Sequence, residues 1–344
     1  MSAGRALPVV DWPLAGRTAA RVVRPGPVTD RAAAAAVVAE LADAAVRAEG
    51  PVRELTGLAD GLAVAPALVV DRSRWAQAAA MSMEVLTNTA AVAGGPRPGL
   101  SGRAAGLQAG ALLGYLSSAI LGQFDPFTHQ PGTSSGTLLL VAPNIVAVER
   151  ASGVDPHDFR LWVCLHEVTH RVQFTSVPWL GEYMASTVAT LTSVDASTIA
   201  VTRLLADLRR GTRPEGALDV LRALQAPPQQ AALDALLALG TLLEGHADHV
   251  MDSVGPAVVP TVRQIRTVFD RRRRRPSNPV HRVLRAVLGI DAKIAQYVRG
   301  KAFVDHVVAS VGMAGFNMVW STAQTLPVDA EISDPDRWIS RVLG

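Results

Sequence analysis

The sequence predicts a mainly α-helical fold with one small β element. Long Ala- and Leu-rich segments carry apolar residues at helical spacing, and Asp, Thr or Pro residues mark where they begin. The segment 137–142, TLLLVA, is the best candidate for a strand, and Pro143 follows it. The 344 residues are 49% hydrophobic, with no internal repeat and no long linker. We therefore expect one domain over 29–344, preceded by an irregular Pro- and Gly-rich segment, 1–28.

Three helices are expected before the strand. Thr29 or Asp30 can cap an Ala-rich helix that runs to about residue 48, and Asp71 can cap a second one that runs to about residue 92. The third helix, over 101–123, carries a glycine at every fourth position, which allows a neighbouring helix to approach its backbone closely. These glycines are Gly106, Gly110 and Gly114.

From residue 156 onward, the sequence predicts successive helices separated by Pro residues and polar clusters. The expected ranges are about 157–175, 179–210, 214–225, 229–253, 257–272, 279–288, 291–311 and 334–342.

The most informative segment is LWVCLHEVTHRVQFTSVPW, at 161–179. It contains the pattern His-Glu-x-x-His as His166, Glu167 and His170. On a helix the two histidines lie one turn apart on one face, so their imidazoles can converge on one metal ion. Glu167 can take a proton from metal-bound water, whose pKa zinc lowers to about 7. The alternative is a pair of core histidines beside a glutamate, which leaves an unpaired charge in the interior.

A catalytic zinc needs a third protein ligand, and the segment 241–252, TLLEGHADHVMD, is the best candidate to supply it. On a helix, Glu244 and Asp248 share one face, and His246 lies on another. We expect Glu244 to be the ligand and Asp248 to accept a hydrogen bond from a ligating histidine. His246 is the alternative ligand, and a residue elsewhere, such as Glu182, is a more distant one.

Two further residues are candidates for catalysis. His249 could donate a proton or hydrogen-bond a tetrahedral intermediate; a polar histidine on the helix surface is the alternative. Tyr183 follows the metal-binding helix closely, and a phenol can stabilise an oxyanion. Its alternative is core packing with a hydrogen-bonded hydroxyl.

The composition of the chain limits the classes of partner and the cellular compartment that we expect. The single Cys164 excludes an internal disulfide, and no secretory signal opens the sequence, so a cytoplasmic location is expected. The apolar runs are too short or too interrupted to span a bilayer. The net charge is +3, and five adjacent arginines occupy 271–275 without interleaved aromatic residues. We expect no nucleic-acid partner. The sequence does not determine the oligomeric state.

Several sequence motifs match those of a known protein family. They are VDR at 70–72 with Trp75, LGQFDPF at 121–127, LLLVAPNI at 138–145, DFRLWVCLHEVTHRVQF at 158–174, PWL at 178–180, EGHADHVMD at 244–252, LGIDAKIAQYVRGKAFVDHVV at 288–308, GMAGFNMVW at 312–320 and LPVDAEI at 326–332. The chain thus resembles, over roughly residues 60–344, the zincin-like hydrolases of high-GC bacteria. These are described as zinc-dependent metalloproteases, and some are associated with biosynthesis of the deazaflavin coenzyme.

The resemblance implies a zincin-like helical fold with one zinc ion, held by His166, His170 and a residue of the EGHAD segment. Glu167 would be the general base. It also implies that an edge strand aligns an extended peptide, a role for which 137–142 is the candidate; a buried strand or a helix start is the alternative. A zinc hydrolase acting on a peptide or small amide is the expected function. A non-catalytic zinc protein that binds a partner, or an accessory factor in coenzyme biosynthesis, are the other hypotheses.

Overall fold

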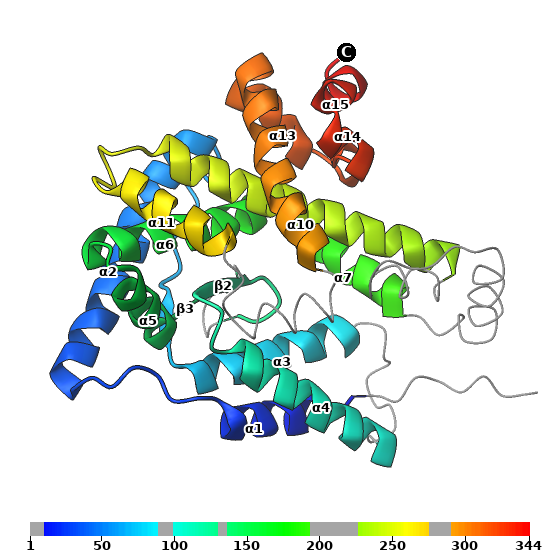
Figure 1. Ribbon diagram of the computed structural model, residues 1–344. Helices are drawn as coiled ribbons and strands as arrows, with labels where there is room; N and C mark the ends of the chain where they lie inside the picture. Colours follow the sequence, from blue (N-terminus) through cyan, green and yellow to red (C-terminus); the bar gives the residue numbers. More distant parts are fainter. Residues whose placement is uncertain (1–9, 89–98, 130–135, 193–225, 275–289) are drawn as a thin grey trace, which may run out of the picture.

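Helices make up most of the described chain, and a three-stranded sheet lies among them (Figure 1). The computed structural model describes residues 10–88, 99–129, 136–192, 226–274 and 290–344, without the side chains of Asn88 and 270–298. The predicted fold class, mainly α with a small β element, is confirmed. The helices expected at 214–225 and 279–288, the part of the expected helix 179–210 that follows residue 192, and the arginine side chains at 271–275 lie outside the described residues.

The expected helices within the described ranges form, and most of their ends lie within a few residues of the prediction. Two ends were predicted wrongly: the first helix runs past residue 48 to Thr56, and the helix expected over 101–123 ends at Leu116, before a strand that begins at Gly122. The helices are α1 (Trp12–Val22), α2 (Arg31–Thr56), α3 (Arg72–Asn88), α4 (Leu100–Leu116), α5 (Ala142–Ser152), α6 (Pro156–Ser176), α7 (Pro178–Thr192), α10 (Pro227–Ser253), α11 (Val262–Arg274), α13 (Ile290–Phe316), α14 (Asp329–Ser333) and α15 (Pro335–Val342). Two short 3-10 helices, η1 (Asn317–Trp320) and η2 (Ala323–Thr325), follow α13.

Helices α1, α5 and α14 were not expected, and α1 and α5 each have a proline at the second position. α1 lies within the segment 1–28, so the prediction that this segment is irregular is wrong there. The side chain of Asp11 accepts a hydrogen bond from the backbone N–H of Leu14 at 2.9 Å, and Pro13 occupies the first turn. Pro143 occupies the first turn of α5 in the same way. Proline fits this turn because its fixed φ is helical and no hydrogen bond needs its missing N–H.

The segment predicted as a possible edge strand is instead the buried centre of the sheet. β3 (Thr137–Val141) pairs in parallel with β1 (Leu68–Val70) and antiparallel with β2 (Gly122–Asp125), and all five of its residues are buried. Of the alternatives for 137–142, the buried strand is therefore confirmed and the edge strand is wrong, because two strands that the sequence did not reveal flank it. β2 is an edge strand, and it lies against α6.

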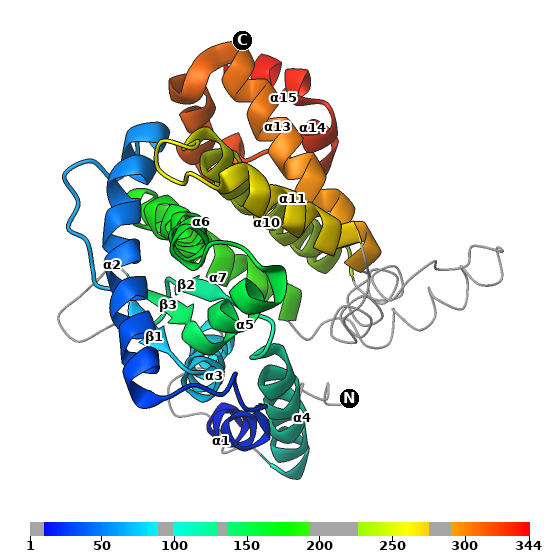
Figure 2. The same ribbon diagram turned by 60° about the vertical axis from the view of Figure 1, so that its left-hand side comes forward.

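Helix α6 is at the centre of the largest hydrophobic core. Figure 2 shows it between α2 and α10, with the strands below it. Apolar side chains of α2, the sheet, α6 and the C-terminal half of α10 form this core, whereas the middle of α10 packs with α7 and α13 in a second one. Because α10 contributes side chains to both cores, packing on two sides holds it in place against α6.

The glycines of α4 allow α1 to lie directly against its backbone, which confirms the interpretation of their spacing. A Cβ built on Gly110 would lie 2.5 Å from the carbonyl oxygen of Ala15, and one on Gly106 would lie 2.5 Å from that of Asp11. Real side chains do not approach backbone atoms so closely, so any larger residue would push the helices apart.

A second close approach holds α10 against α13. A Cβ on Gly245 would lie 2.2 Å from the carbonyl carbon of Gly300, and a Cβ on Gly300 would lie 2.2 Å from the carbonyl oxygen of Thr241. Both obstacles are backbone atoms, which cannot rotate away. The contact is next to Glu244, so it helps to determine where that residue lies.

Gly245→Ala is therefore expected to lower the free energy of unfolding by about 1–3 kcal/mol, because the added methyl group overpacks the helix crossing. Gly240→Ala is the matched control on the same helix, since nothing lies within 4 Å of its added Cβ. It should be neutral or stabilising by up to about 1 kcal/mol, because alanine favours a helix over glycine. Denaturant unfolding measures both changes, and equal destabilisation would contradict the close approach.

One described stretch, Arg299–Trp320, is long and apolar enough to cross a membrane by length and composition alone. It is not a continuous helix, because Gly312 has φ 75° and ψ 171° within it. Its buried Phe303 and Val307 belong to the core shared with α10. The absence of a membrane span and the cytoplasmic location stay predictions.

Candidate metal centre

Three side chains converge between α6 and α10. The Nε2 atoms of His166 and His170 lie 3.2 Å apart. The Glu244 carboxylate lies 3.4 Å from Nε2 of His166 through Oε2, and 3.7 Å from Nε2 of His170 through Oε1. Among the described residues, this is the group of three or more His, Cys, Asp or Glu side chains whose ligand atoms could hold a metal ion.

The local structure of α6 sets the histidine pair. Asp155 caps the helix by accepting a hydrogen bond from the backbone N–H of Asp158 at 2.9 Å, and Pro156 fills the first turn. The helix then runs without interruption, so His166 and His170 lie one turn apart, with ring centroids 4.7 Å apart and ring planes at 88°. Both rings thus point their Nε2 atoms at the same place.

The donor set fits a zinc ion. Ligand atoms bound tetrahedrally at about 2.0–2.2 Å from zinc lie about 3.3–3.6 Å from one another. The separations of 3.2, 3.4 and 3.7 Å are close to these values. Two imidazoles and one carboxylate are also a donor set that zinc favours.

The site attracts positive charge. Burial acts to lower the pKa of His166, but the hydrogen bond and charge of Glu244 outweigh it and raise the pKa to about 9. Burial lowers the pKa of His170, and the charge of Glu244 only partly offsets this. In the metal-free protein a proton therefore resides near Glu244. A metal ion would displace it, as is usual when histidines become ligands.

Glu167 lies beside the cluster and against the edge strand. Burial raises the pKa of its carboxyl group to about 7, although the charge of His166 opposes the shift. A Cβ built on Gly122, the first residue of β2, would lie 2.6 Å from Cδ of Glu167. Glycine at this position therefore allows β2 to run directly beside the carboxylate.

Of the candidate third ligands, the structure brings Glu244 to the histidine pair. His246 is fully buried on another face of α10, where its ring packs against Phe316 and Trp320 at centroid distances of 5.1 and 5.6 Å. Burial lowers the pKa of His246 to about 3. Glu182 is exposed on α7. Sequence reasoning left these alternatives open because helix periodicity does not tell which face of α10 meets α6.

The hydrogen-bonding position expected for Asp248 is occupied by residues that the sequence analysis missed. Nδ1 of His166 lies 3.2 Å from the sulfur of Met251, and Nδ1 of His170 lies 2.9 Å from Oε1 of Gln173. Asp248 instead accepts a hydrogen bond from Arg266 at 3.2 Å. Its negative charge raises the pKa of both imidazoles, but by less than burial and Glu244 change them. The three-residue spacing from His170 to Gln173 was the available signal.

The two further catalytic candidates lie on the helices that surround the site. Nδ1 of His249 lies 2.7 Å from Oδ1 of Asp305, so this edge of the imidazole ring is directed at α13. The ring of Tyr183 packs edge-on against Trp179 at 6.0 Å, and burial raises the pKa of its hydroxyl. The proposed roles of His249 and Tyr183 in catalysis stay predictions.

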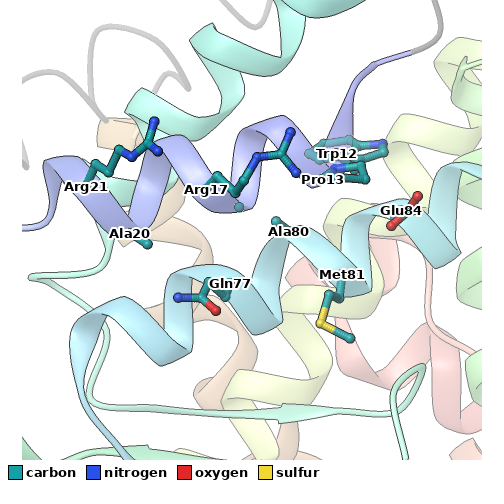
Figure 3. Close-up of a pocket in the computed structure, with 10 residues that line it drawn as sticks. Trp12, Pro13, Arg17, Ala20, Arg21, Gln77, Ala80, Met81 and Glu84 are labelled. Carbon is teal, nitrogen blue, oxygen red and sulfur yellow. The ribbon is translucent and has the colours of Figure 1, made fainter. Parts of the chain in front are cut away.

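A separate cavity of about 360 Å³ lies between α1 and α3 (Figure 3). Its walls include Trp12, Arg17 and Arg21 of α1, and Met81 and Glu84 of α3. None of the residues that line it belongs to the His166 cluster. The convergence between α6 and α10 is therefore the stronger candidate for chemistry.

Comparison with known proteins covers nearly the whole chain. Residues 10–339 match a protein family described as "Zincin-like metallopeptidase". No curated protein matches. A crystal structure described as that of a candidate hydrolase with a novel fold, from Chloroflexus aurantiacus, is similar to this chain with 28% sequence identity and a TM-score of 0.68. The similarity covers 97% of this chain and 98% of that chain, so it includes both α6 and α10.

Proposed function

Because the chain belongs to the zincin-like metallopeptidase family, we propose that it is a zinc-dependent hydrolase that cleaves peptide bonds. The observation that carries the proposal is the convergence of His166, His170 and Glu244 with Glu167 beside them. Three protein ligands are typical of catalytic zinc, whereas structural zinc usually has four. Within the described ranges, no fourth His, Cys, Asp or Glu joins the group.

The four side chains of the site would have two different roles, metal binding and proton transfer. His166, His170 and Glu244 would hold the metal. When bound, zinc would lower the pKa of a coordinated water and polarise the scissile carbonyl. Glu167 would accept a proton from the attacking water and pass it to the leaving nitrogen. Its buried carboxyl, with a pKa raised to about 7, suits a group that must both take up and release a proton near neutral pH.

The edge strand β2 supports a peptide as the substrate. β2 is hydrogen-bonded to β3 on one side and begins at Gly122, beside the carboxylate of Glu167. An extended peptide can add to such an edge through main-chain hydrogen bonds. We propose that β2 aligns the substrate in this way and thereby places a peptide bond near Glu167. This assigns to 122–125 the role that the sequence analysis considered for 137–142.

The proposal is tested by incubating the full-length, zinc-loaded protein with a library of peptides and identifying new termini by mass spectrometry. We expect cleavage that stops when a chelator removes the metal and returns when zinc is added back. A zinc-loaded protein that cuts no member of the library would contradict the assignment as a peptidase. A parallel screen of small amides would then show whether the substrate is a smaller molecule.

A further inference from the structure

We infer that Gln173 is a positioning residue that fixes which nitrogen of His170 carries the proton, and that His246 holds Gln173 in place. The inference rests on the proposed function, because it concerns a proposed zinc ligand. Gln173 is completely buried between α6 and α10. Its side-chain oxygen lies 2.9 Å from Nδ1 of His170, and its side-chain nitrogen lies 3.0 Å from both the carbonyl oxygen of Leu243 and Nδ1 of His246.

The orientation of the amide follows from the Leu243 carbonyl, which can only accept a hydrogen bond. The NH2 group of Gln173 must therefore face α10, and its oxygen must face His170. An amide oxygen only accepts, so Nδ1 of His170 must be the protonated nitrogen. This leaves the Nε2 lone pair of His170 directed at His166 and Glu244, as ligation requires.

His246 completes the arrangement from the other side. The second hydrogen of the Gln173 amide points to Nδ1 of His246, so that nitrogen must be an acceptor and the proton of the neutral ring must be on Nε2. That Nε2 atom is buried and has no hydrogen-bond partner among the described residues; the ring contacts Phe316 and Trp320. His246 can thus act as a fixed acceptor for Gln173. The two donors and the acceptor of the amide are then all used.

The two proposed histidine ligands are supported differently. His170 donates to the oxygen of an amide group whose nitrogen donates two further hydrogen bonds, whereas His166 faces a thioether sulfur, which is a weak acceptor. Loss of an outer partner of a metal-bound histidine typically weakens metal binding 10- to 100-fold. We therefore expect the loss of Gln173 to have an effect in this range.

The first readout is the tautomer of His170 in the metal-free protein, measured by long-range proton–nitrogen NMR on full-length protein labelled at histidine and assigned with His170→Ala. In the wild type, the proton should be on Nδ1. Gln173→Leu should release the ring to populate both tautomers. Gln173→Glu should keep the proton on Nδ1, because a carboxylate also only accepts; a merely space-filling role would not produce this difference.

The second readout is the zinc dissociation constant, measured by competition with a chelator. Gln173→Leu should raise it 10- to 100-fold. Gln229→Leu replaces another buried glutamine, which lies near the start of α10 and about 22 Å before Glu244 along the helix, and it should leave both readouts unchanged. If Gln173→Leu does not fold, the wild-type spectrum by itself still tests whether the proton is on Nδ1, and a proton on Nε2 in Gln173→Glu would contradict the role of residue 173 as an acceptor.

A wild-type spectrum with the proton on Nε2 of His170 would overturn the inference, and so would a Gln173→Leu protein with an unchanged spectrum and zinc affinity. Failure of the proposed function looks different, because a wild-type protein that binds no zinc would refute the metal centre while its metal-free spectrum still reported the tautomer.

Discussion

Replacing Glu167 with glutamine is expected to lower kcat/KM for peptide cleavage by roughly 10²- to 10⁴-fold, the range that general acid–base groups contribute. Glutamine keeps the shape of the side chain beside Gly122 but cannot take a proton from water. The zinc content should stay at the wild-type level, because Glu167 is not one of the three converging side chains. Steady-state kinetics and elemental analysis of the same preparation test both statements.

Asp234→Asn is the control for this substitution, since it removes an exposed carboxylate from the first half of α10. It should leave both the kinetics and the zinc content unchanged. If Glu167→Gln retained wild-type activity, the assignment of Glu167 as the base would be refuted. If it lost zinc together with activity, Glu167 would have to be reassigned as a ligand.

Glu244→Ala is expected to weaken zinc binding by more than roughly 100-fold, the upper end of the effect of losing an outer partner. The carboxylate supplies the negative charge that raises the pKa of His166, and it reaches both imidazoles. Without it, the site has two neutral nitrogen donors. Isothermal titration or chelator competition measures the change, and activity should fall in parallel when zinc is limiting.

Substitutions of the other two candidate ligands, Glu182 and His246, are the controls for Glu244→Ala. Glu182→Ala removes an exposed carboxylate from α7 and should not change zinc affinity. His246→Phe preserves the packing against Phe316 and Trp320 and should weaken zinc less than Glu244→Ala does. A larger loss in His246→Phe than in Glu244→Ala would show that the third ligand is wrongly assigned.

Much of the helical architecture was predictable, because its signals are local. The helix expected over 157–175 is observed as α6, Pro156–Ser176, since a capping Asp155 and a first-turn proline act on neighbouring residues only. The same signals were misjudged at Pro13 and Pro143, where a proline that starts a helix was taken for part of an irregular segment or for the end of a strand.

The flanking strands were not predictable in this way. β1 has three residues and β2 has four, beginning at Gly122, so neither shows a clear alternating pattern. They are strands because β3 offers hydrogen-bonding partners on both sides. That pairing joins segments about 70 residues apart in one case, and no local pattern reveals it.

By itself, the sequence determined that His166, Glu167 and His170 share one helix, because a helix repeats every 3.6 residues wherever it lies. It also identified the segment that brings the third acidic or imidazole group. Only the tertiary structure shows that Glu244, and not His246, lies next to the histidine pair, because that depends on which face of α10 meets α6. The same packing placed Gln173 and Met251 behind the two rings, and Gly122 beside Glu167. These contacts are between elements, and their geometry is set by the shared core rather than by local periodicity.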